Sequence, residues 1–252
     1  MWRFLWDPVS RSSKLRRLSW MNRQADCPAL STRADLLLLH RRLNQVLADA
    51  EDHWNSYDYG RRVRQGWSEI GISIFRDTGA PLEQMRLRER VDGRTVLEIG
   101  CNSGFLSSAI AEHAESVTGF DLDPYMVAVA QIVADQLVRS DVDFMTSGFE
   151  EFQGNMTFDA VLFLANHSTC DDNTRQDTYS FLARCHRVLS PGGRLLFESH
   201  PPAWEGNRLK DVIRTMVTGF AVLEQKILTG GTLLDQGCTF IVAEPRDGQA
   251  HG

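Results

Sequence analysis

Residues 96–104 read Val-Leu-Glu-Ile-Gly-Cys-Asn-Ser-Gly, and this stretch decides the fold. The apolar residues around Glu98 predict a buried strand, and the two glycines with the apolar helical pattern behind them predict a tight turn that opens a helix. Glycine lets the backbone turn sharply and lets a ligand approach it closely. The start of the helix offers unpaired N–H groups and a partial positive charge. The stretch therefore predicts a ligand-binding turn at the end of a strand.

Further elements follow at the spacing of a doubly wound sheet. A second short strand, residues 117–121, ends in Asp121, about twenty residues beyond the first loop, where such a fold places the acid that holds ribose hydroxyls. Asp123 and Pro124 are typical of a helix N-terminus. Later strands are predicted at residues 142–145, 158–164, 194–198, 220–227 and 238–243, with the last two forming an antiparallel hairpin and a helix predicted at 211–217.

The glycine spacing separates this turn from the dinucleotide fingerprint G-x-G-x-x-G, because Gly100 and Gly104 lie four residues apart. A nicotinamide oxidoreductase is therefore disfavoured. Residues 94–200 instead resemble the class I S-adenosylmethionine-dependent methyltransferases, whose first signature is an acidic residue, x, Gly, x, x, x, Gly. The resemblance implies the α/β class and a Rossmann-like doubly wound sheet, mostly parallel, with a C-terminal antiparallel hairpin and a helical N-terminal cap.

The same resemblance implies where S-adenosylmethionine, or its product S-adenosylhomocysteine, would lie. Glu98 would sit under the methionine part, although it could simply cap the glycine turn, and Asp121 would hold the ribose. The loop after the third strand would line the adenine by stacking and backbone contacts, since Phe149 replaces the family's frequent acidic residue. The implied cofactor-binding residues are Glu98, Gly100, Cys101, Asn102, Gly104, Asp121, Leu122, Gly148, Phe149 and Ala165.

Methyl transfer is an in-line displacement at a carbon that the sulfonium already activates, so the protein needs mainly to align the acceptor. A general base is needed only if the acceptor must lose a proton. His167 follows the fourth strand and His200 the fifth, at the carboxyl ends where ligands bind in such sheets. Each is a candidate base or acceptor contact, or a histidine that only hydrogen-bonds a loop. No metal is expected, because no ligand spacing is evident.

Three regions are predicted: an arm over residues 1–30, a helical cap over 31–90 and the cofactor-binding core over 91–252. The arm mixes aromatic and basic residues. It is interpreted either as a segment that rests on an anionic membrane or partner, or as a flexible arm or packed helix. In the cap, aromatic rings could attract a sulfonium and an arginine could grip an acidic acceptor, or they could be core and surface residues. These candidates are Tyr57, Tyr59, Trp67 and Arg76.

Composition narrows the function classes. The net charge of −6 argues against wholesale nucleic-acid binding, although the first fifty residues carry nine Lys/Arg against four Asp/Glu. The five cysteines form no C-x-x-C pair, which favours a reducing, cytoplasmic compartment. No stretch has the length of a membrane span or the pattern of a secretory signal.

The expected function is methyl transfer from S-adenosylmethionine to an oxygen or nitrogen of a small molecule. A tRNA-modifying enzyme is the first alternative, because residues 66–78 faintly resemble the tRNA-uridine carboxymethyltransferases. A catalytically silent cofactor-binding subunit is the second. The acceptor and the oligomeric state stay open at this point.

Overall fold

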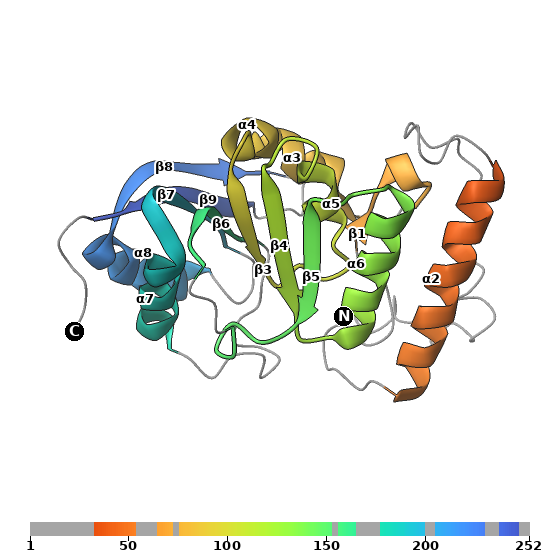
Figure 1. Cartoon of the computed structure of the whole chain (residues 1–252). Coiled ribbons are helices and arrows are strands. Elements are labelled where there is room, and N and C mark those ends of the chain that lie inside the picture. The colour runs from red at the N-terminus through yellow and green to blue at the C-terminus, as the bar shows by residue number, and fades with distance from the viewer. Residues whose placement is uncertain are drawn as a thin grey trace.

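The computed structural model describes residues 33–53, 65–72, 76–152, 156–164, 177–199, 205–229 and 237–246. A sheet of seven strands lies at the centre, with helices on both faces (Figure 1). The strands of this sheet are β3 (Thr95–Ile99), β4 (Ser116–Asp121), β5 (Val142–Thr146), β6 (Phe158–Phe163), β7 (Leu189–Glu198), β8 (Phe220–Leu228) and β9 (Cys238–Pro245).

Helices α2, α3 and α4 come before β3, and the other described helices lie in the connections β3–β4, β4–β5, β6–β7 and β7–β8. The described helices are α2 (Arg33–His53), α3 (Gly79–Gln84), α4 (Leu87–Val91), α5 (Phe105–Ile110), α6 (Pro124–Gln136), α7 (Thr178–Val188) and α8 (Gly206–Gly219). Between α2 and α3 the chain forms a small unit of two parallel two-residue strands and a single 3-10 turn. These are β1 (Gln65–Gly66), η3 (Ser68–Ile70) and β2 (Arg76–Asp77).

The strand order is β5-β4-β3-β6-β7-β9-β8. The first five strands in this order are parallel, while β9 runs antiparallel to both of its neighbours. The predicted α/β class, the doubly wound parallel core and the C-terminal antiparallel hairpin are therefore confirmed. The last strand of the chain lies inside the sheet, which leaves β8 as the outermost strand on that side.

Each face of the sheet has its own apolar core, because successive side chains of a strand point to opposite faces. On β3, Val96 packs with the core beside α2, α5 and α6, whereas Leu97 packs with the core beside α7 and α8. The parallel strands are buried on both faces and so read as nearly continuous apolar runs. Glu98 therefore points to the same face as Val96, the face that α5 covers.

Helix α2 packs alongside α6, on the side of α6 that faces away from the sheet (Figure 1). Its buried stripe contains Leu36, Leu39 and Leu43. The sequence of α6 is apolar around most of its surface, so it can bury one side against the sheet and another against α2. Within the described residues, α2 thus extends one flank of the molecule, and the function of residues 31–90 as a cap stays a prediction.

None of the helices in the described ranges is long and apolar enough to cross a lipid bilayer.

Candidate functional site: the glycine turn and its carboxylates

The predicted turn after β3 is tied directly to the end of β4. The backbone N–H groups of Gly100 and Cys101 both donate to the carbonyl oxygen of Phe120, each at 2.9 Å. Three residues of the turn have left-handed backbone, with φ of 71° at Gly100, 51° at Asn102 and 65° at Gly104. Glycine adopts this conformation without steric cost and asparagine tolerates it, so the residue types fit the turn.

Gly104 is also required by close packing. A Cβ atom added there would lie 2.4 Å from Cβ of Ala130 and 2.6 Å from Cζ of Phe144. Atoms of real side chains do not approach that closely, so α5 can start this near to α6 and β5 only with glycine at its N-cap. The glycine therefore sets how tightly the turn sits against the carboxyl end of the sheet.

Asp121 closes the turn from the neighbouring strand. Its Oδ2 accepts the backbone N–H of Asn102 at 2.8 Å, and its Oδ1 accepts the backbone N–H of Asp123 at 2.9 Å. The side chain is 8% exposed. Each carboxylate oxygen can accept more than one hydrogen bond, so Asp121 keeps capacity for donors from a ligand. Asp121 lies beside the turn, and its role in holding ribose hydroxyls stays a prediction.

Glu98 lies on the neighbouring strand β3 and is more deeply buried than Asp121. It is 4% exposed, and the hydroxyl of Ser107 on α5 donates to its Oε2. Burial raises the pKa of Glu98 to about 7, with the negative charge of Asp121 adding to the rise and the Ser107 hydrogen bond opposing it. The carboxyl therefore binds a proton more readily than an exposed glutamate does. A nearby cation would favour its charged form.

The side chains between the two glycines are buried. Burial, together with the charges of Asp121 and Glu98, raises the pKa of the Cys101 thiol well above its ordinary value, so this thiol is not an activated nucleophile. The Oδ1 of Asn102 accepts the backbone N–H of Ser103 at 2.8 Å. The hydroxyl of Ser103 is buried and has no hydrogen-bond partner among the described residues. It is therefore a polar group that a ligand in the turn could satisfy.

The loop that was predicted to line the adenine behaves differently from expectation. The ring of Phe149 is buried in the core, with ring centroids 5.9 Å from Phe120 and 5.2 Å from Phe181, and the guanidinium of Arg184 lies 5.3 Å from its centroid. The predicted stacking of this ring on adenine therefore has no support, because the ring is buried among Phe120, Phe181 and Arg184. A backbone contact from this loop stays a prediction.

Gly148 and Leu122, two of the residues predicted to bind the cofactor, lie close together. A Cβ atom added at Gly148 would come within 3.4 Å of Cδ2 of Leu122, which is ordinary van der Waals contact. Asp123 begins α6 as predicted, and its Oδ1 accepts the backbone N–H groups of Tyr125 and Met126 at 2.9 and 3.2 Å. The loops after β4 and β5 thus lie close to each other beside the glycine turn.

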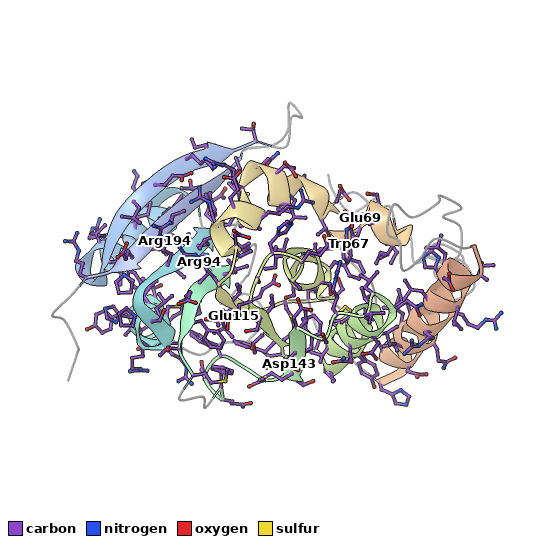
Figure 2. The ribbon with its side chains drawn as sticks, turned by 45° about the horizontal axis from the view of Figure 1, so that its top comes forward. Trp67, Glu69, Arg94, Glu115, Asp143 and Arg194 are labelled. Carbon is purple, nitrogen blue, oxygen red and sulfur yellow. The ribbon has the colours of Figure 1, made fainter. Side chains whose placement is uncertain are left out.

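The acceptor side of the site is described only in part. Trp67 is buried between α2 and α5, with its ring centroid 6.2 Å from that of Phe105, and its Nε1 has no partner in the described ranges (Figure 2). It is therefore a core residue next to the glycine turn. Arg76 belongs to β2 and only its backbone is described. The other candidates, which lie outside the described residues, are Tyr57, Tyr59, Ala165, His167 and His200.

Sequence reasoning missed Ser107, the hydrogen-bond donor to Glu98. The available signal was its position in the first turn of the helix that follows the glycines, on the face that turns back toward β3. In the part of the chain that the structure describes, no group of three or more His, Cys, Asp or Glu side chains could hold a metal ion.

Comparison with known proteins agrees with this geometry. Residues 97–197 match the family model of a methyltransferase domain. The ubiquinone biosynthesis O-methyltransferase of Pseudomonas entomophila (strain L48) is 33% identical over 126 residues, which are 47% of this chain and 50% of that protein. The protein of the same name from Pseudomonas paraeruginosa (strain DSM 24068 / PA7) is 31% identical over 115 residues, covering 44% and 47%. The chain thus spans about half the length of the curated relatives it matches.

A solved structure shows the same fold over a longer range. The N-methyltransferase NodS from Bradyrhizobium japonicum WM9, in complex with S-adenosyl-l-homocysteine, superposes with a TM-score of 0.57 at 18% identity, covering 84% of this chain and 99% of that chain. The glycine turn, Glu98 and Asp121 all lie within the residues that the family model matches. Residues 97–197 thus match a methyltransferase domain, and the sheet has the Rossmann-like fold of this solved methyltransferase.

Proposed function

We propose that this protein transfers a methyl group from S-adenosylmethionine to an oxygen of a small-molecule acceptor. The observation that carries the proposal is the pair of buried carboxylates, Glu98 and Asp121, at the ends of neighbouring parallel strands with a glycine turn between them. The names of the curated relatives favour oxygen over nitrogen, since both are called O-methyltransferases.

The residues of the turn fit this cofactor. Asp121 can accept hydrogen bonds from ribose hydroxyls while it keeps the backbone donors of Asn102 and Asp123. Glu98, in its ionised form, suits the cationic amino group of the methionine part, and the unpartnered hydroxyl of Ser103 offers a further hydrogen bond. When bound, S-adenosylmethionine supplies a methyl carbon already activated by the sulfonium. The chain then needs to hold the acceptor in line with it.

The first experiment is calorimetric titration of the full chain with S-adenosylhomocysteine. Asp121→Ala removes the proposed ribose acceptor, whose charged hydrogen bonds are worth about 1.5–3 kcal/mol, so affinity should fall at least about tenfold. Asp143→Ala is the matched control, because Asp143 is an exposed carboxylate on the adjacent strand β5 (Figure 2). Its affinity should equal that of the wild type. Thermal unfolding of each variant confirms that it is folded.

The outcome separates the alternatives. A folded wild-type chain that does not bind S-adenosylhomocysteine would overturn the proposal. Equal affinity of Asp121→Ala and wild type would remove the assigned site. If binding is confirmed, release of S-adenosylhomocysteine from S-adenosylmethionine is measured with a panel of hydroxyl- and amine-bearing small molecules and with tRNA. Turnover with any of them excludes a catalytically silent subunit, and the preferred class identifies the acceptor.

A further inference from the structure

Strand β8 forms an open edge of the sheet. It pairs with β9 on one side, and in the described ranges no strand pairs with its other side (Figure 1). An open edge presents a row of backbone N–H and C=O groups that can pair with another strand. At nine residues, β8 is long for an edge strand, and natural proteins usually keep such edges short or covered.

A β-bulge changes which side chains this edge exposes. The register of β8 against β9 shifts between Val222 and Glu224, so the alternation of faces reverses there. Before the bulge, Phe220 and Val222 pack with the core under α7 and α8. After it, the residues on that face are no longer buried. Leu223 is 50% exposed and Ile227 is 72% exposed, with exposed Gln225 between them.

The exposed segment is self-complementary in one antiparallel register. If two copies pair about a two-fold axis at Gln225, Leu223 of one copy lies opposite Ile227 of the other, and Glu224 lies opposite Lys226 of the other. The register therefore pairs apolar residues with each other and opposite charges with each other. The two-fold symmetry makes each of these pairs occur twice. Cross-strand pairs of these kinds stabilise a sheet, and like charges directly opposite destabilise it. We propose that β8 is the interface of a homodimer in which two sheets join antiparallel through residues 223–227.

Glu224 and Lys226 also have partners within their own chain. Oε2 of Glu224 lies 2.6 Å from a guanidinium nitrogen of Arg90 on α4, and its Oε1 lies 3.1 Å from the ammonium of Lys226. That ammonium also lies 5.3 Å from the ring centroid of Phe240 on β9. Lys226 is therefore laid back over the face of the sheet and does not project over the open edge. In many proteins a lysine on an edge strand blocks pairing with another strand. Lys226 does not block it here, so the backbone of β8 stays accessible.

The dimer should be weak. A standard stable interface buries about 800 Å² on each partner, and five residues of one strand with their neighbours supply less than that. A closed two-fold contact nevertheless uses up the edge, so it ends at two copies and does not propagate. We expect mostly monomers at about 1 μM and mostly dimers at about 100 μM, which corresponds to a dissociation constant of about 10 μM.

Sedimentation velocity of the full chain across this concentration range tests the proposal. Ile227→Lys places a charge opposite Leu223 of the other copy. This variant should therefore stay monomeric at about 100 μM, where the wild type should be mostly dimeric. Met156→Lys is the matched control, because Met156 is an apolar residue with 60% exposure that lies outside β8. It should dimerise like the wild type. A wild type that stays monomeric, or an Ile227→Lys variant that still dimerises, would overturn the proposal.

Oxidative cross-linking tests the register. In Gln225→Cys the two new thiols lie directly opposite, with Cα atoms about 4.5–5.5 Å apart, a separation that a disulfide spans. A covalent dimer should therefore form on oxidation and disappear on reduction. Ile227→Cys is the control, since its two copies would lie four residues apart along the strands, or about 13 Å. Cross-linking of Ile227→Cys in preference to Gln225→Cys would show a different register and contradict the proposal.

Discussion

The two ends of the same sheet hold carboxyl groups in opposite environments, with Glu98 buried at one end and Asp159 half-buried at the other. At the carboxyl end, Glu98 has hydrogen bonds only from Ser107 among the described residues, and burial raises its pKa to about 7. At the amino end, Asp159 accepts from the hydroxyl of Ser190 at 2.7 Å and from the backbone N–H and hydroxyl of Thr95 at 3.1 and 3.0 Å. These hydrogen bonds lower the pKa of Asp159, with the Ser190 bond contributing most.

The difference supports the proposal that the carboxyl end binds a ligand. Asp159 has enough donors to stay ionised, so it clamps β3, β6 and β7 together as a structural element. Glu98 is desolvated without a full set of donors, which costs stability in the free protein. A cationic ligand beside Glu98 would recover that free energy. Perturbed groups of this kind gather at functional sites because function, and not stability, keeps them there.

The largest expected effect tests the packing of the two ends. Gly104→Ala at the carboxyl end adds a Cβ 2.4 Å from Ala130 to a residue with φ of 65°. Overpacking and left-handed strain together should cost about 3–5 kcal/mol of the free energy of unfolding. Gly192→Ala at the amino end is the control, since its φ is 75° but nothing lies within 4 Å of the added Cβ. It should cost about 1–2 kcal/mol. Equal losses in urea unfolding would show that the crowding at Gly104 is unimportant.

The next effect is the pH dependence of stability. The pKa of Glu98 rises from an ordinary 4.5 to about 7 on folding, so between these values the folded protein binds more protons than the unfolded chain. Stability should therefore fall as pH rises through this window, by about 3 kcal/mol from this group. Urea unfolding at pH 4.5 to 8 measures it. In Glu98→Gln the loss should disappear, while a wild type and variant with parallel pH profiles would contradict the raised pKa.

The smallest effect comes from the amino end. Asp159→Asn removes the charge that Ser190 and Thr95 stabilise, and it should lower the free energy of unfolding by about 1–2 kcal/mol. Because Asp159 lies at the far end of the strands from the turn, affinity for S-adenosylhomocysteine should change less than about twofold, which is below the energy of one net hydrogen bond. Its pH profile between 4.5 and 8 should run parallel to that of the wild type, since its lowered pKa lies below this range. A large loss of affinity would show that the two ends are coupled.

Much of this protein could be predicted from its sequence because the signals are local. The glycine turn, the acid at the end of the next strand and the N-cap at Asp123 are each set by a few adjacent residues. Parallel strands then bring their carboxyl ends to one edge, so the apolar runs with their terminal acids were enough to place Glu98 beside Asp121. The resemblance to the methyltransferases rests on these same residues.

Other features depend on residues far apart in the chain, and only the tertiary structure decided them. Phe149 could have faced adenine, but Phe120, Phe181 and Arg184 enclose its ring. The stripe of leucines on α2 required an apolar partner without specifying α6. The bulge in β8 turned Ile227 outward, and desolvation by the assembled core set the pKa of Glu98. Turns and caps are fixed by neighbours in sequence, whereas burial is a property of everything that packs around a group.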